Sequence, residues 1–227
     1  MDYILNIHTT SETAIVNLAK GSEVLTTSVN SDSRHHAAFL HTAIDKILQE
    51  TNVSPSILKA IGVTGGPGSY TGIRVGLATA KGLCFALKIP MIMMNTLEVM
   101  AFSAIENIGN KNALYCPMID ARRMEVFTAV YDSQLKEITA PEAVVLDENS
   151  FKSLVKKDAL FFFGSGAAKF AKIINSANAN YHFAEEPLSS SALGRFAWNK
   201  FLKNEFDNIS NSKPLYVKEF YSNSAIR

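Results

Sequence analysis

The segment VTGGPGSYTGIRVG, residues 63–76, constrains the fold most, because five glycines and a proline follow directly on an apolar stretch. Glycine-rich backbone before a helix either approaches a phosphate or lets another part of a protein come close. The P-loop requires Gly-Lys-Ser/Thr, which occurs nowhere in the 227 residues, and the dinucleotide fingerprint GxGxxG stops one glycine short after Gly68. Pro67 also lacks an amide donor. Close packing is therefore the favoured interpretation, and anion binding at the helix start is the alternative.

Four small residues recur at every fourth position of the helix predicted over 71–87, namely Gly72, Gly76, Ala80 and Cys84. Residues four apart share one helix face, so this small-residue stripe would let a second helix approach closely. Two glycines in a helix interior cost about 1 kcal/mol each relative to alanine, and close packing would offset that cost. The partner helix belongs either to the same chain or to another subunit, and the residues alone leave both open.

Hydrophobic periodicity predicts three strands, a helix, a strand and a helix in this order twice. In the first half we expect strands at 3–8, 13–19, 24–29, 60–63 and 91–94, and helices at 33–50, 71–87 and 95–107. In the second half we expect strands at 114–119, 125–131, 135–139 and 160–163, helices at 151–155, 167–174 and 191–202, and an extended tail at 213–227. This pattern predicts an α/β protein with two mixed-sheet subdomains, 1–106 and 107–227, and a cleft between them.

Composition excludes several classes of protein. Lys plus Arg total 22 and Asp plus Glu total 21, so no overall charge attracts the chain to nucleic acid or membrane. The most apolar stretch, 83–94, is interrupted by Lys88 and Pro90, so no membrane span is predicted. The N-terminus lacks a secretory signal pattern, and Cys84 and Cys116 form no CxxC motif. We therefore expect a cytoplasmic protein with reduced thiols.

Several motifs, taken in order, resemble those of the TsaB family, also called YeaZ. GGPGSYTGIRVGLATAKGLCFALKIP at 65–90 with NTLEVMA at 95–101 resembles the first family signature, and IDARRMEVFTAVY at 119–131 resembles the second. ILNIHTTSETAIVNL at 4–18, FFFGSGAAKF at 161–170 and KPLYVK at 213–218 resemble the opening strand pair, the third glycine element and the closing segment. The resemblance covers nearly the whole chain.

This resemblance implies an actin/Hsp70-like (ASKHA) fold of two ribonuclease-H-like halves. It also implies a non-catalytic accessory subunit that docks on TsaD and, with the ATPase TsaE, supports N6-threonylcarbamoylation of the adenosine beside the anticodon in tRNA. The family docks through its first two long helices, and the same surface often mediates self-association, which leaves a homodimer of the isolated chain open. No intrinsic cofactor is expected. ATP or ADP would bind only at the complex interface, and tRNA would be reached through the complex.

With this resemblance, the small-residue stripe is interpreted as an intermolecular face. The residues expected to bind the partner are Ala37, Leu40, His41, Ile44, Gly72, Gly76, Ala80 and Cys84. Arg74 lies in the first turn of its helix, where a cation opposes the helix dipole, which indicates an anionic partner such as Glu12, Glu98 or a carboxylate of another protein. Arg122 and Arg123 lie at a predicted hairpin tip, where they either face solvent or contact tRNA phosphate or a partner.

No catalytic or metal-binding residues are predicted. An ATPase of this fold carries an acidic residue on its first strand, and the matching residue here is His8, which cannot be a hard anionic magnesium ligand. Asp120 lies on the second hairpin, but bulky residues follow it where such enzymes are glycine-rich. No two of the five histidines are three or four residues apart, which disfavours a metalloprotease. The alternative function is an ATP-dependent phosphotransferase with Asp120 as base or metal ligand.

Overall fold

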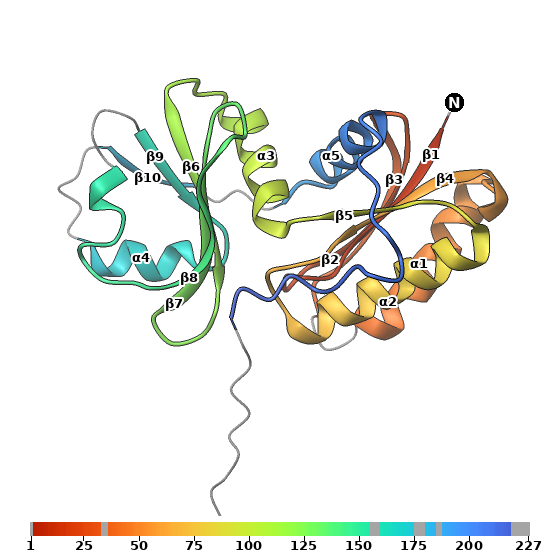
Figure 1. The fold of residues 1–227 in the computed structure, drawn as a ribbon, viewed down its shortest axis with the longest axis horizontal. Coiled ribbons are helices and arrows are strands. Elements are labelled where there is room, and N and C mark those ends of the chain that lie inside the picture. The colour runs from red at the N-terminus through yellow and green to blue at the C-terminus, as the bar shows by residue number, and fades with distance from the viewer. Residues whose placement is uncertain (1, 33–35, 155–158, 175–179, 185–187, 219–227) are drawn as a thin grey trace, which may run out of the picture.

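A computed structural model describes residues 2–32, 36–154, 159–174, 180–184 and 188–218, which form two five-stranded mixed sheets (Figure 1). The first lobe contains β1 (Tyr3–His8), β2 (Ala14–Lys20), β3 (Glu23–Asn30), α1 (His36–Thr51), β4 (Leu58–Thr64), α2 (Tyr70–Leu87) and β5 (Met91–Met94). Helix α3 (Thr96–Ile108) leads to the second lobe, which contains β6 (Ala113–Asp120), β7 (Glu125–Asp132), β8 (Glu137–Val145), β9 (Ala159–Phe163), α4 (Ala167–Ile173) and β10 (Tyr181–Ala184). Helix α5 (Ser190–Leu202) follows, and short 3₁₀ turns lie at Pro55–Ile57 and Lys152–Leu154.

The two sheets have the same topology. The strand order is β3-β2-β1-β4-β5 in the first lobe and β8-β7-β6-β9-β10 in the second. In each sheet the first three strands are antiparallel, and the last two join the central strand in parallel. This duplicated arrangement confirms the predicted α/β fold of two ribonuclease-H-like halves, as in the actin/Hsp70 class.

Differences from the predicted elements lie mainly in the second lobe. Strand β8 extends to Val145 rather than to residue 139, because its alternation of half-buried and exposed residues continues past Pro141 on the sheet edge. Strand β10 was missed, since four half-exposed residues carry too little periodicity to predict it. The start of the predicted first helix at 33–35 and the end of the tail at 219–227 lie outside the described residues.

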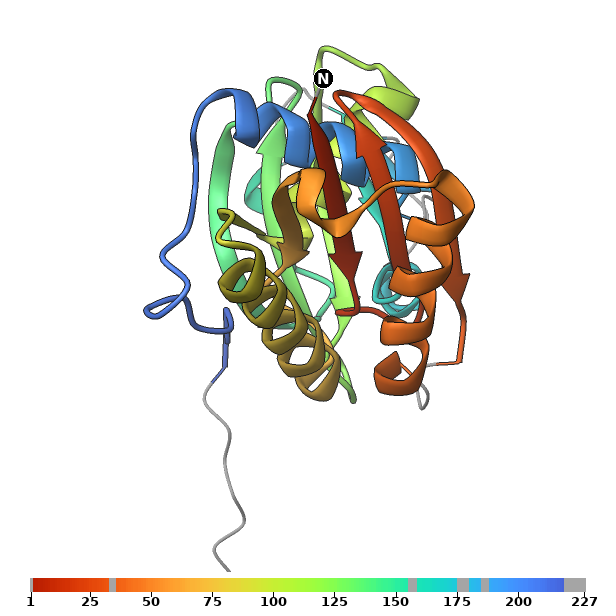
Figure 2. The ribbon, with the colours of Figure 1, turned by 90° about the vertical axis from the view of Figure 1, so that its right-hand side faces the viewer.

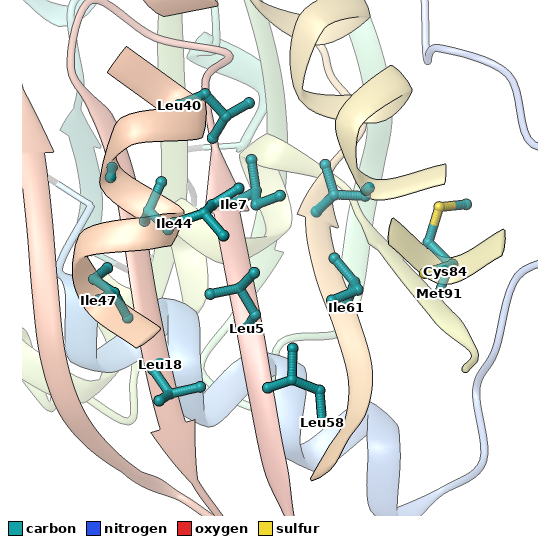
Figure 3. Packing of buried hydrophobic residues seen from close by; sticks show 14 of the residues in the cluster. Leu5, Ile7, Leu18, Leu40, Ile44, Ile47, Leu58, Ile61, Cys84 and Met91 are labelled. Carbon is teal, nitrogen blue, oxygen red and sulfur yellow. The ribbon is translucent and has the colours of Figure 1, made fainter. Parts of the chain in front are cut away.

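Helices cover both faces of the first sheet. Alternate residues of β1 separate two cores: Leu5 and Ile7 pack toward α1 and α2, whereas Ile4 packs toward α5. Figure 3 shows the first of these cores, in which Leu40, Ile44 and Ile47 of α1 lie over the sheet. Helices α1 and α2 therefore form one outer layer of the first lobe, on the side away from the second lobe (Figures 1 and 2).

The last helix of each half of the chain packs on the sheet of the other half. Helix α3 packs on β6 and β7 of the second lobe, while α5 packs on β1, β2 and β3 of the first lobe. Arg195 of α5 and Glu106 of α3 join these helices through hydrogen bonds of 2.9 and 2.6 Å. Helix α5, which follows the expected division at 106/107 in the chain, thus packs on the first sheet, because its apolar stripe fits the open face of that sheet. No helix in the described ranges is both long and apolar enough to cross a bilayer.

Candidate functional site

The glycine run packs against the loop between β1 and β2 of its own chain. The Ser69 amide donates to the Thr10 carbonyl at 2.7 Å, and the Thr9 hydroxyl donates to the Gly72 carbonyl at 2.7 Å. A Cβ on Gly68 or Gly72 would collide with the carbonyl oxygens of Thr10 and Thr9 respectively. Glycine is therefore required here by close approach of backbone to backbone within one subunit.

Three amide groups at the start of α2 already have acceptors from this chain. Besides the Ser69 amide, the Gly72 amide donates to the Ser69 hydroxyl at 3.2 Å, and the Ile73 amide donates to the Ser69 carbonyl at 2.8 Å. Ser69 is thus an ordinary N-cap of α2. This use of the donors argues against the anion-binding alternative, because a phosphate would have to displace bonds that hold the loop in place.

His8 ends β1 at the position where an ATPase of this fold would carry an acid, and it is fully surrounded. Its Nδ1 lies 3.1 Å from the Thr64 hydroxyl and its Nε2 lies 2.8 Å from the Ser11 hydroxyl. Burial, with a smaller contribution from His36, lowers the pKa of His8 from 6.5 to about 3, so the ring is neutral at neutral pH. His8 is therefore held as an uncharged part of a hydroxyl-rich core, and a neutral imidazole does not supply the anionic oxygen ligand that Mg²⁺ prefers.

Asp120 of the second hairpin has a cationic partner. Its carboxylate lies 2.6 Å from the Lys169 ammonium and also accepts from the Arg122 amide. Partial burial by itself raises the pKa of Asp120, but the Lys169 hydrogen bond, the Arg122 amide and the Lys169 charge outweigh it, so the pKa lies below its ordinary value. Asp120 is ionised and neutralised by Lys169, which makes it a poor general base.

The small-residue stripe faces the interior of this chain, which corrects its interpretation as an intermolecular face. Gly72, Gly76, Ala80 and Cys84 are buried, and a Cβ on Gly76 would collide with the Thr9 hydroxyl. Ala80 and Cys84 belong to the core formed with β1 and β4. The stripe therefore seats α2 on its own sheet.

Of the residues expected on α1, two are also buried. Leu40 and Ile44 pack on the first sheet, whereas Ala37 and His41 are exposed on the outer surface. The physical reason is that α1 is amphipathic, so its apolar positions cover the sheet and its small and polar positions face outward. Six of the eight named residues therefore lie on the inner sides of α1 and α2, and a role of these helices in docking stays a prediction.

A second row of small residues occupies the outer side of α2. Ala78, Gly82 and Ala86 are exposed at four-residue intervals, and a Cβ on Gly82 would meet nothing within 4 Å. Between α1 and α2 lies an open groove of about 520 Å³, lined by His41, Ile44, Asp45, Ala78, Thr79, Gly82 and Leu83. Phe85 stands beside Gly82 with 80% of its surface exposed. We call this groove together with Phe85 the outer α1/α2 face. The two helices that carry it lie toward the viewer in Figure 2.

Arg74 finds aromatic rather than carboxylate partners. Its guanidinium lies 3.9 Å from the centre of the Tyr70 ring and donates to the Tyr216 hydroxyl at 3.0 Å. Neither Glu12 nor Glu98 forms an ion pair with Arg74 in the described part of the chain. A cation–π contact and a hydrogen bond thus offset the unfavourable interaction of the Arg74 charge with the helix dipole.

Other charged and thiol groups are placed as follows. Arg122 and Arg123 are exposed at the hairpin tip, both with positive φ, and contact of their side chains with an anion stays a prediction.

Among the described residues, no cluster of three or more His, Cys, Asp or Glu could hold a metal ion. Burial raises the pKa values of the Cys84 and Cys116 thiols to about 12, so neither is a reactive thiolate.

Comparison with known proteins identifies the relationship. Residues 23–223 match the family described as TsaD, tRNA N6-adenosine threonylcarbamoyltransferase. The tRNA threonylcarbamoyladenosine biosynthesis protein TsaB of Bacillus subtilis is 31% identical over 157 residues, which cover 68% of this chain and 67% of that protein. The TsaB protein of Escherichia coli is 36% identical over 98 residues, covering 43% of this chain and 42% of that protein.

A solved structure confirms the fold. A Pseudomonas aeruginosa protein described as similar to peptidase YEAZ superposes with a TM-score of 0.81 at 24% identity, covering 96% of this chain and all of that one. Three observations agree with the same family relationship. They are the duplicated sheets, the packing of the glycine run on the β1–β2 loop, and the family match along most of the chain. The chain belongs to the TsaB (YeaZ) branch of the tRNA N6-adenosine threonylcarbamoyltransferase family.

Proposed function

We propose that this chain is an accessory subunit in the biosynthesis of threonylcarbamoyladenosine in tRNA, and that it docks on a TsaD homologue through the outer α1/α2 face. The names of its relatives support the pathway. In this proposal the TsaD homologue carries out the N6-threonylcarbamoylation beside the anticodon, a TsaE homologue joins the same complex, and tRNA is reached through that complex in the cytoplasm. The same face accounts for a homodimer when the chain is alone.

The observation that carries this proposal is the chemistry of the outer α1/α2 face. Ala78 and Gly82 leave the helix backbone open to close approach, and Phe85 exposes a large apolar ring next to them. A partner helix could lie along this groove with its side chains over the small residues and its edge against Phe85. Large aromatic side chains, phenylalanine among them, are enriched at protein–protein interfaces relative to the rest of the surface.

The accessory role rests on the two hairpins. His8 is neutral and buried where an acidic ligand would be needed, and Asp120 is bound to Lys169. Neither His8 nor Asp120 is therefore placed to hold Mg²⁺-nucleotide or to activate water by itself. A nucleotide site would accordingly be formed together with the partner rather than within this chain.

The test compares Gly82→Leu and Phe85→Ala with wild type in binding to the purified TsaD homologue by isothermal titration. We expect both variants to remain folded and to lose at least about tenfold in affinity, because each changes the centre of the face. Ala168→Leu, an exposed position on α4 of the second lobe, is the matched control and should bind normally. Unaltered affinity of both face variants would reject the docking surface.

A parallel titration separates the accessory role from an enzyme. Wild-type chain alone is titrated with MgATP and assayed for phosphate release. Absence of both binding and turnover, with restored threonylcarbamoylation of tRNA when the chain is added to TsaD and TsaE homologues, supports the accessory subunit. Tight binding with turnover by the isolated chain would instead establish an ATP-dependent phosphotransferase.

A further inference from the structure

After α5 the chain continues as an extended strap, residues 205–218, along the edge of the first lobe. The Asp207 carboxylate accepts from the Met93 amide at 2.7 Å, and the Asp207 amide donates to the Met91 carbonyl at 2.8 Å. Farther on, the Leu215 amide donates to the Gly65 carbonyl at 2.8 Å. Figure 2 shows the strap running down beside α2. Its path is thus fixed at both ends by backbone hydrogen bonds.

Between the strap and α2 lies a groove of about 430 Å³, lined by Arg74, Leu77, Ala78, Lys81, Ser212, Lys213, Pro214 and Tyr216. We call it the strap groove. Three of these residues are cations and none is acidic. Lys81 donates to the Ser212 carbonyl at 2.7 Å, Arg74 contacts Tyr70 and Tyr216, and Lys213 is exposed.

The three positive charges are not neutralised within the described part of the chain. Arg74 and Lys81 bond to uncharged groups, a phenol and a carbonyl, which satisfy their N–H donors but leave their charges in place. Neither α2 nor residues 208–218 contains a single Asp or Glu, so both walls of the groove lack a carboxylate. No ion pair joins any of the three cations to an acid elsewhere in the described ranges. An anionic ligand therefore fits this groove electrostatically.

The lining favours a carboxylate on a protein over an RNA phosphate backbone. Leu77, Ala78 and Pro214 give the groove apolar walls that suit the methylenes of acidic side chains and apolar neighbours. The Tyr70 and Tyr216 rings already stack on each other, with centres 5.5 Å apart, and Arg74 lies over Tyr70. The faces of the two tyrosine rings and the Arg74 guanidinium are thus partly occupied by each other. RNA recognition instead uses accessible aromatic faces to stack bases and accessible guanidinium groups to bind phosphate.

The strap groove is continuous with the outer α1/α2 face, because Ala78 lines both. We propose that the strap groove binds an acidic segment, Asp or Glu flanked by apolar residues, of the same protein that docks on the outer α1/α2 face. This inference rests on the proposed function. The face supplies apolar contact, and the groove selects a partner that carries negative charge beside its docking helix.

The experiment uses the full chain with the double substitution Lys81→Gln and Lys213→Gln, which removes two charges and keeps a donor near Ser212. The control is Lys59→Gln with Lys136→Gln, two exposed lysines outside the groove, so the net charge change is equal. Affinity for the TsaD homologue is measured over a series of salt concentrations. Separately, each chain is titrated with a short synthetic peptide of alternating Glu and Leu and with unfractionated tRNA.

We expect the groove variant to lose about tenfold in affinity for the TsaD homologue at low salt, and its affinity to depend less on salt than that of wild type. The peptide should bind wild type and control but not the groove variant. Equal affinities of variant and control for both ligands would overturn the inference. Loss of tRNA binding alone, with TsaD and peptide binding intact, would also overturn it and assign the groove to RNA.

Failure of the proposed function gives a different pattern. If wild type does not bind the TsaD homologue at all, the docking proposal fails, yet the peptide titration still decides the chemistry of the groove. Peptide binding that is lost in the Lys81/Lys213 variant would support an acidic protein ligand from another partner. No peptide binding to wild type would reject the groove as a site for acidic segments.

Discussion

Replacing two glycines of α2 by alanine should have opposite effects on stability. Both Gly76 and Gly82 lie in the helix interior, so alanine at either position removes a helix-propensity penalty of about 1 kcal/mol. At Gly82 the new Cβ meets nothing within 4 Å, and the full gain is expected. At Gly76 the Cβ collides with the Thr9 hydroxyl, which must then give up its 2.7 Å bond to the buried Gly72 carbonyl.

The buried Thr9 hydroxyl then lacks its acceptor, and a buried polar group without a partner costs about 1–3 kcal/mol, which outweighs the propensity gain. We therefore expect Gly82→Ala to raise the free energy of unfolding by about 1 kcal/mol and Gly76→Ala to lower it by about 1 kcal/mol. Urea denaturation followed by circular dichroism measures both, and the m-value should be unchanged. The two variants thus differ only in which side of one helix carries the added methyl group.

A double-mutant cycle isolates the cause. In Thr9→Ala the colliding hydroxyl is gone, and the next contacts of a Cβ at Gly76 are ordinary ones, 3.6 Å to Ile7 and 3.7 Å to the Cβ of residue 9. In that background Gly76→Ala should become stabilising. If Gly76→Ala stabilises the wild-type chain as much as Gly82→Ala does, the inward packing of the small-residue stripe is refuted.

Three further outcomes are expected. Because the pKa of His8 in the folded chain, about 3, lies below its ordinary 6.5, its contribution to stability is complete above pH 6.5 and is lost as the pH falls toward 3. This amounts to about 2 kcal/mol between pH 7 and pH 5, and His8→Asn should remove it in urea titrations at each pH. Asp207→Ala removes the acceptor of the Met93 amide and should lower the free energy of unfolding by about 1–2 kcal/mol while increasing tryptic cleavage in the strap. Cys84 and Cys116 should react with a thiol reagent at pH 8 only on unfolding, because burial raises both pKa values to about 12; fast reaction of the native chain would contradict this.

The positions of Gly76 and Gly82 determine which glycine substitution can test the docking proposal. A bulky residue at Gly76 would strike the β1–β2 loop of its own subunit, so loss of partner binding there would report damage to the fold. The same substitution at Gly82 leaves the core untouched. Only the second position can therefore separate docking from folding.

Local patterns in the sequence were enough to predict the fold. Period-two strands and period-3.6 helices depend on neighbouring residues, and these patterns predicted nearly every element and the duplicated order. The glycine run and the histidine at position 8, where an ATPase of this fold has an acid, could also be identified from the sequence. Both depend only on which residue type occupies a given position of a motif. Family motifs then indicated the TsaB relationship.

The tertiary structure decided which side of each helix is the surface. Helix α2 carries two rows of small residues, Gly72 to Cys84 and Ala78 to Ala86, and both satisfy the same four-residue spacing. Nothing local distinguishes them, because small side chains give no strong amphipathic contrast. The choice is made by the β1–β2 loop, whose Thr9 approaches from more than 60 residues away in the chain. The strap groove has the same origin, since Lys81 and Lys213 share a surface only after α5 has returned the chain to the first lobe.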